Sequence, residues 1–134
     1  MPVTLMNPAG LMKSDMYSQV AIATGTRHVH VAGQVAYDAD GQILARGDLA
    51  GQVEQAYRNV ATALAAAGAT FNDVVRLKIY VVGWTLDMMP DFAAGLERAA
   101  SEHGQSLAPA SLIGVSMLFD PAILVEIEAT AVLD

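Results

Sequence analysis

The segment 109–132 most constrains the fold, because two runs of apolar β-forming residues flank the tetrapeptide Phe119-Asp120-Pro121-Ala122. An Asp-Pro pair favours a turn, and proline cannot donate to a strand ladder, so the pattern predicts two strands joined as a β-hairpin. Side chains alternate between the two faces of a strand, which places Glu126 and Glu128 on the same face. An unpaired buried carboxylate is costly, so these two residues indicate a charged partner or a ligand on that face.

Length and composition predict one globular domain, 1–134, that forms oligomers. A chain of 134 residues buries roughly two-thirds of its unfolded surface, which is enough to fold alone. Hydrophobic residues make up 54% of the chain and charged residues only 16%, which is more apolar surface than a small monomer readily hides. The absence of cysteine excludes disulfide and thiolate chemistry and fits a reducing, cytoplasmic location.

Charge and hydropathy also narrow the range of partners. Residues 1–15 lack a basic region followed by an apolar core, and no apolar run approaches the roughly 18 residues of a membrane span, so we expect an untargeted protein with no membrane partner. Seven Lys and Arg residues stand against fourteen Asp and Glu residues, for a formal charge of −7. This balance repels nucleic acid, and no basic patch opposes it.

Two strands are predicted in the first part of the chain and one strand between two helices in the middle. Residues 1–14 show no period and are predicted to be irregular, whereas 17–24 and 28–35 are predicted to form a hairpin. Helical periodicity begins after Asp48, a suitable N-cap, and is stopped by Gly68, and a second helix starts at Pro90 and ends before Gly104. The strand between them is 74–82.

These elements predict an α+β fold: a single mixed sheet of about six strands with two helices on one face. The helices cover only one side of the sheet. Along strand 74–82, Arg76, Lys78 and Tyr80 point to the opposite side, together with Glu126 and Glu128. Charged groups among apolar neighbours suit burial between subunits, where the charges pair or bind a ligand.

Five fragments, in this order and spacing, resemble the Rid/YjgF family, also called the L-PSP endoribonuclease family. They are Val31-Ala32-Gly33-Gln34, QVEQAYRNV (52–60), NDVVRLKIYVV (72–82), Pro109-Ala110 and VEIEA (125–129). The resemblance extends from Tyr17 to Val132. It implies a chorismate-mutase-like fold and a homotrimer in which the sheets face inward and small molecules bind in three clefts between subunits.

The resemblance also implies an activity, the hydrolysis of reactive enamines and imines to ketoacids and ammonia. Glu126 matches the family's water-activating glutamate, Tyr17 a site-lining tyrosine, and Gly33 a glycine whose backbone approaches the ligand. The family's carboxylate-binding arginine corresponds to Ser111, and an asparagine that contributes to the site corresponds to Ala93. Serine cannot capture a carboxylate through two charge-assisted hydrogen bonds.

Losing a charged hydrogen bond of about 1.5–3 kcal/mol weakens carboxylate binding roughly ten- to a hundred-fold unless another cation substitutes. Arg76 and Lys78 are candidates for that substitute, although an interface ion pair with the strand carboxylates is the simpler interpretation. Tyr80 is a candidate for the cleft wall. Ser111 is interpreted as a pocket-lining hydroxyl, since no His or Lys partner is positioned to activate it.

Other roles remain open for three residues. Gly33 permits close approach of a ligand or relieves a bulge. His28 and His30 share one strand face, but no third ligand is evident, so we expect no metal and no cofactor.

The leading hypothesis is a small-molecule-binding trimer that hydrolyses imines or enamines, with Glu126 as the base. The alternative is a non-catalytic ligand-binding or interaction trimer, and ribonuclease activity finds little support in an acidic chain without a basic groove.

Overall fold

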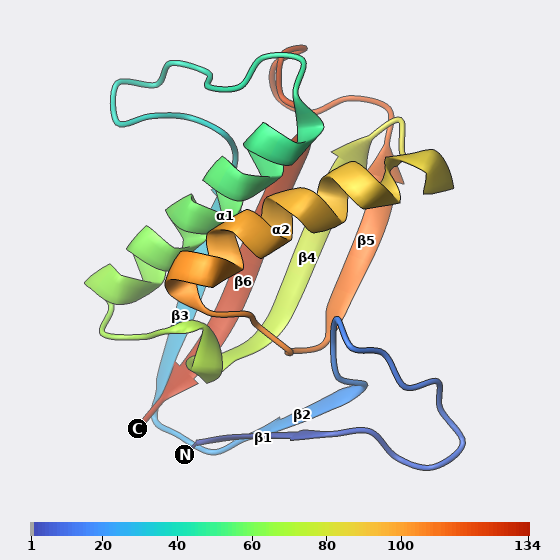
Figure 1. The fold of residues 1–134 in the computed structure, drawn as a ribbon. Coiled ribbons are helices and arrows are strands. Elements are labelled where there is room, and N and C mark those ends of the chain that lie inside the picture. Colours follow the sequence, from blue (N-terminus) through green and yellow to red (C-terminus); the bar gives the residue numbers. More distant parts are fainter. Residues whose placement is uncertain (1) are drawn as a thin grey trace.

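The computed structural model describes residues 2–134 and contains six strands, two α-helices and two short 3-10 helices (Figure 1). In chain order these elements are β1 (Val3–Met6), β2 (Val20–Ala23), β3 (Arg27–Gln34), α1 (Leu49–Ala66), η1 (Phe71–Asp73), β4 (Val74–Val82), η2 (Leu86–Met88), α2 (Met89–His103), β5 (Ala110–Val115) and β6 (Val125–Leu133).

The α+β architecture is confirmed, with both helices on one face of the main sheet (Figure 1). The six strands divide into two sheets rather than one. The main sheet has the order β3-β6-β4-β5, in which β4 and β5 are parallel and the other pairs are antiparallel. Strands β1 and β2 form a separate antiparallel pair. The face of the main sheet opposite the helices is therefore open to a ligand or another subunit.

The predicted hairpin within 109–132 is wrong. Strand β5 pairs with β4 in parallel, while β6 lies between β4 and β3. The turn itself forms, because the N–H groups of Ala122 and Ile123 donate to Oδ1 and O of Asp120 at 2.8 and 2.9 Å. The inner-facing residues of β6 are buried, and a central position gives this strand two hydrogen-bonded neighbours.

The hairpin predicted from 17–24 and 28–35 is also wrong. Within 1–14, predicted to be irregular, Val3–Met6 forms strand β1, whereas 7–14 contains no helix or strand. Strand β2 pairs with β1, and β3 pairs with β6. Gly25 explains the change of sheet, because a Cβ at this position would overlap the carbonyl oxygen of Leu133 and the side chain of Val132. The chain thus passes directly against the end of β6 before β3 begins. Tyr17 precedes β2 and belongs to no strand.

Both helices begin and end as predicted. Oδ1 of Asp48 accepts from the N–H of Gly51 at 3.1 Å, which caps α1. Gly68 follows α1 with φ of +80° and Gly104 follows α2 with φ of +81°, a region that glycine enters without steric cost. Pro90 lies in the first turn of α2.

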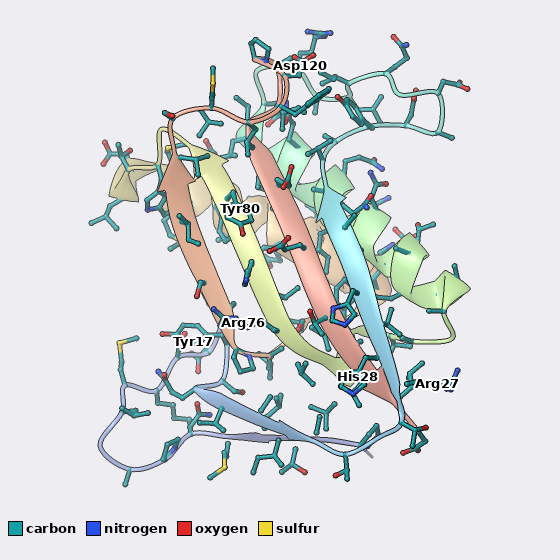
Figure 2. The ribbon with its side chains drawn as sticks, turned by 180° about the vertical axis from the view of Figure 1, so that it is seen from behind. Tyr17, Arg27, His28, Arg76, Tyr80 and Asp120 are labelled. Atoms are coloured by element: carbon teal, nitrogen blue, oxygen red, sulfur yellow. The ribbon has the colours of Figure 1, made fainter. Side chains whose placement is uncertain are left out.

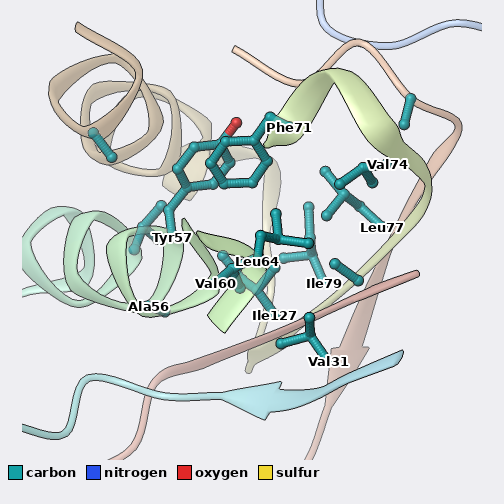
Figure 3. Packing of buried hydrophobic residues seen from close by; sticks show 14 of the residues in the cluster. Val31, Ala56, Tyr57, Val60, Leu64, Phe71, Val74, Leu77, Ile79 and Ile127 are labelled. Atoms are coloured by element: carbon teal, nitrogen blue, oxygen red, sulfur yellow. The ribbon is translucent and has the colours of Figure 1, made fainter. Parts of the chain in front are cut away.

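The core lies between α1 and the inner face of the sheet (Figure 3). Val60 and Leu64 of α1 are fully buried against strand residues such as Ile127. Tyr57 stacks on Phe71 with a centroid separation of 4.2 Å. Within residues 2–134, no helix is long and apolar enough to cross a bilayer.

Candidate functional site

The open face of the main sheet carries the charged residues that the sequence predicts for it (Figure 2). In the register between β4 and β6, Tyr80 lies opposite Glu126 and Lys78 lies opposite Glu128. Tyr80 Oη donates to Glu128 Oε1 at 3.0 Å, and Lys78 Nζ lies 3.9 Å from the same oxygen. Glu128 therefore has one hydroxyl donor and one nearby cation, which gives it the structural role of a paired carboxylate.

Glu126 has a different environment. Its side chain is half-buried, and among residues 2–134 it forms neither a hydrogen bond nor an ion pair. Burial, and secondarily the negative charge of Glu128, raise the pKa of Glu126 above the ordinary glutamate value of 4.5. A carboxylate with a raised pKa and a free pair of oxygens is suited to accept a proton.

A pocket of about 310 Å³ lies beside Glu126. Gly33 forms part of its wall, within the irregular stretch of the β3–β6 register between Val31 and Gln34. A Cβ at Gly33 would overlap the carboxylate of Glu126. Gly33 lies in this irregular stretch, and its missing side chain makes room for the candidate base. The pocket is lined by Gly33, Gln34, Val35, Tyr37, Phe119, Ile123 and Glu126.

Three other predicted positions line a second cavity, of about 430 Å³, between α2 and the inner side of β4 and β5, whereas Tyr80 does not. Tyr17, Ala93 and Ser111 all line it, so three positions that the family resemblance relates to one site do lie together. Arg76 Nη2 donates to Ser111 Oγ at 2.5 Å. Figure 2 shows Arg76 and Tyr17 at the same end of the sheet.

Arg76 is available to a ligand, because no carboxylate in the chain from residue 2 onward lies within ion-pair distance of it. Lys78, the other predicted substitute for the missing arginine, instead approaches Glu128. Tyr80, two residues after Lys78 on β4, donates its hydroxyl to Glu128. Lys78 is the register partner of Ser111, but of the two predicted substitutes Arg76 is the one that donates a hydrogen bond to it.

The Glu126 pocket and the Arg76–Ser111 pair do not meet within one chain. Tyr80 is opposite Glu126, whereas Arg76 lies four residues earlier on β4. At about 3.3 Å per residue, this separation along the strand is about 13 Å. Glu126 with Gly33 and Arg76 with Ser111 are thus two half-sites at different ends of one sheet face.

Two further contributors were not foreseen from the sequence. Phe119, with 88% of its surface exposed, lines the pocket beside Glu126, and this aromatic residue next to the Asp-Pro turn was the available signal. Gln52 is fully buried and links α1 to the turn before β6: Nε2 donates to Ala122 O at 2.8 Å and Oε1 accepts from Leu124 N at 2.9 Å. Nothing in the helical pattern distinguished Gln52 from its neighbours.

His28 and His30 lie on β3 with ring centroids 6.5 Å apart, and both are exposed. In the part of the chain that the structure describes, no group of three His, Cys, Asp or Glu residues is positioned to hold a metal ion. The histidine pair thus lacks the further ligand that a zinc site requires.

A mixed four-stranded sheet with two helices on one face is the fold that this chain shares with solved YjgF-like proteins. The Endoribonuclease L-PSP family model matches residues 10–133. A RutC family protein of Pyrococcus horikoshii is 36% identical over 115 residues, which cover 86% of this chain and 85% of that protein. The chain belongs to the Rid/YjgF, or L-PSP, family.

Solved structures agree with this assignment. The Rid-family protein YyfB of Yersinia pestis superposes with a TM-score of 0.89 and 37% identity, covering 99% of this chain and all (100%) of that one. YjgF of Escherichia coli gives a TM-score of 0.69 with 26% identity, covering 96% and 94% of the two chains. The chain thus matches its structural relatives over nearly their whole length.

Proposed function

We propose that this protein is a cytoplasmic homotrimer that hydrolyses reactive imines or enamines in clefts between subunits, with Glu126 as the general base. One observation carries the proposal: the carboxylate of Glu126 is half-buried, has no side-chain partner among residues 2–134, and is accommodated by the missing side chain of Gly33. A carboxylate kept for structure alone would be expected to have a cation or a hydroxyl partner, as Glu128 has.

The chemistry needs only a positioned base. As a water oxygen bonds to the imine carbon, Glu126 accepts one water proton and passes it to the nitrogen, which gives a carbinolamine. Glu126 then moves the remaining hydroxyl proton to the nitrogen while the C–N bond breaks. The products are one carbonyl compound and one ammonia, so atoms and charge balance. An enamine reaches the same route after protonation at its β-carbon.

The trimer is proposed because the two half-sites are separated within one chain. A neighbouring subunit facing the same sheet surface would bring its Glu126 pocket to the Arg76–Ser111 end of the first. Exposed apolar side chains on and just after β5 support burial of this edge of the sheet between subunits, since Ile113 is 42% and Met117 71% exposed. Light scattering at micromolar concentration tests the assembly, and a monomer would remove the shared cleft.

Arg76 is the proposed replacement for the family's carboxylate-binding arginine. Its guanidinium already adjoins the residue at the family's arginine position, through the hydrogen bond to Ser111. The proposed substrate therefore carries an anionic or strongly polar group, held by Arg76, on the side away from the attacking water. Arginine offers further N–H groups beyond the one given to Ser111.

A non-catalytic ligand-binding trimer is the second candidate. The observation that favours it is the coincidence of Ala93 and Ser111 at one cavity, because two polar positions of the family's imine deaminases are reduced there to small side chains. The description of the family model also names an endoribonuclease. A net charge of −7 argues against this third activity.

The deciding experiment generates imines enzymatically from several amino acids and records whether the protein accelerates ammonia release. We expect wild type to be active and Glu126→Gln, still trimeric, to be inactive. If wild type is silent and Ser111→Arg gains activity, the scaffold is competent but its natural ligand lacks the carboxylate. If all three proteins are silent, the non-catalytic candidate replaces the proposal.

A further inference from the structure

Phe119 has the most exposed large apolar side chain among residues 2–134, with 88% of its surface accessible. Phenylalanine is usually buried, because its ring gains free energy by leaving water. A single exposed ring elsewhere on the surface would need no explanation. Phe119, however, lines the pocket of about 310 Å³ that also holds the carboxylate of Glu126. Its exposure at that pocket points to an occupant that covers the ring.

The turn that carries Phe119 is held in place by hydrogen bonds. Oδ1 of Asp120 accepts from the Ala122 N–H at 2.8 Å, and Nε2 of the buried Gln52 donates to the Ala122 carbonyl at 2.8 Å. Figure 2 shows Asp120, the neighbour of Phe119, at the end of the sheet away from Arg76. A ring on a fixed backbone loses little conformational freedom when a ligand binds, so this turn presents a preformed contact surface.

The other walls of the pocket are apolar or uncharged around one acid. Val35 and Ile123 are buried and supply hydrocarbon, and Tyr37 supplies a second aromatic ring. Among the lining residues that the structure describes, Glu126 is the one acid, and none is a lysine or an arginine. Ionised Glu126 would repel an anionic group from this pocket but would attract a protonated imine. The pocket therefore suits an apolar, uncharged or cationic part of a ligand.

From this arrangement we infer a substrate class: imines or enamines that carry a planar aromatic ring, which packs on Phe119 while the reacting carbon lies beside Glu126. The inference deepens the proposed function and rests on it for the reacting group alone. Aromatic rings attract one another in offset-stacked or edge-to-face arrangements. A volume of about 310 Å³ is at the small end of ligand pockets, roughly 300–1,000 Å³, which favours one ring over a long chain. Phe119 is thereby the residue that determines specificity.

The first test uses two unreactive, uncharged probes, benzamide and acetamide. Both carry a planar amide that can donate to Glu126, and they differ by the ring. NMR titration should give a dissociation constant at least ten-fold lower for benzamide, because the ring leaves water for an apolar surface. Phe119→Ala should weaken benzamide binding about two- to twelve-fold, which corresponds to about 0.5–1.5 kcal/mol for one aromatic pair, and should leave acetamide binding unchanged.

Three further variants separate the ring from general apolar packing. Phe119→Leu keeps an apolar side chain but removes the ring, so the preference for benzamide should decrease, whereas Phe119→Tyr should retain it. Leu86 is 82% exposed and lines neither cavity. Leu86→Ala removes a comparably exposed side chain and should leave both dissociation constants unaltered. An equal benzamide preference in wild type and Phe119→Leu would overturn the inference.

A second copy of the chain is the competing occupant that could cover Phe119. Light scattering distinguishes the two, because an interface residue stabilises the assembly whether or not a ligand is present. We expect Phe119→Ala to keep the oligomeric state of wild type. Dissociation of the assembly in Phe119→Ala, together with equal affinities of wild type for the two amides, would assign Phe119 to an interface and overturn the inference.

Hydrolysis supplies the second test. Imines generated from phenylalanine should give a kcat/KM at least ten-fold higher than imines from alanine, and Phe119→Ala should reduce this ratio. If benzamide binds as described but no imine is hydrolysed, the ligand class stands and the proposed reaction fails. If imines are hydrolysed with no preference for an aromatic side chain, the reaction stands and the ligand class fails.

Discussion

The backbone of Gly33 lies directly against the carboxylate of Glu126, so closely that a Cβ on Gly33 would overlap Oε2 and Cδ of that side chain. Gly33 does not have a positive φ, and alanine is therefore compatible with its backbone. The reason for a glycine at this position is the space that the candidate base occupies. A substitution at Gly33 can therefore shift the carboxylate of Glu126 while Glu126 itself stays unchanged.

Gly33→Ala is expected to displace Glu126 and to lower kcat/KM for imine hydrolysis at least ten-fold, because a displacement of about 1 Å is enough for such losses. Steady-state ammonia release measures the effect. The double variant Gly33→Ala/Glu126→Asp tests the cause, since the shorter side chain lacks the two atoms, Oε2 and Cδ, that make the closest contacts. Its thermal stability should exceed the sum of the single effects, and strict additivity would contradict the contact.

Glu126→Gln is expected to reduce kcat by about a hundred- to ten-thousand-fold, the usual contribution of a general base. Its thermal stability at neutral pH should be equal to that of wild type or higher. Burial and Glu128 raise the folded-state pKa, so ionised Glu126 destabilises the fold fully above that pKa and has no effect below the ordinary value of 4.5. A stability gain confined to low pH would contradict this sign.

Glu128→Gln separates the two carboxylates. Gln still accepts the hydrogen bond from Tyr80 but removes the negative charge that helps raise the pKa of Glu126. Hydrolysis requires ionised Glu126, so kcat/KM should fall as the pH decreases through the pKa of Glu126. In Glu128→Gln that decrease should move to lower pH. An unchanged pH profile would mean that another group limits the rate.

The positions of the helices and of β4 could be predicted because their signals are local. Asp48, Gly68 and Gly104 mark helix ends through their own hydrogen bonds and backbone angles. Strand β4 has the predicted bounds because apolar and charged residues alternate along it. Strand pairing was not predictable in this way: whether β6 pairs with β5 or β3 depends on contacts distant in sequence, such as that of Gly25 with Leu133.

The site was foreseen in part. The Glu126 and Gly33 positions followed from the resemblance, and their contact agrees with a shared site. The hydrogen bond from Arg76 to Ser111 needed the structure, because these residues come from different strands and the parallel register of β4 with β5 was not predicted. The cavity between α2 and the sheet was equally invisible, since it depends on how α2 packs over β4 and β5.

Moving the arginine tests whether Arg76 replaces the family's carboxylate anchor. Arg76→Ser should raise KM for carboxylate-bearing imines by about ten- to a hundred-fold. Ser111→Arg alone places two guanidinium groups side by side, and their repulsion opposes the gain. The double variant Arg76→Ser/Ser111→Arg should recover at least ten-fold over Arg76→Ser. Failure of the double variant to recover would exclude Arg76 as the anchor.

Gln52 is expected to stabilise the turn that leads into β6. It is fully buried, and its side-chain amide satisfies both Ala122 O and Leu124 N, at 2.8 and 2.9 Å. Gln52→Leu leaves both backbone groups without a partner and should lower the free energy of unfolding by about 2–4 kcal/mol. Urea unfolding at a fixed protomer concentration measures this loss, because subunit association would otherwise shift the midpoint.

Gln55→Leu is the matched control for this prediction. Gln55 lies on the same helix and donates to Asn59 Oδ1 at 2.9 Å, but Asn59 keeps its own bonds to Val35 O and Tyr37 O when Gln55 is replaced. Its cost should stay below about 1 kcal/mol. Equal losses in the two variants would show that helix α1, rather than the turn before Glu126, accounts for the effect. A larger loss in Gln52→Leu, with a parallel decrease in kcat, would tie the position of the candidate base to this buried amide.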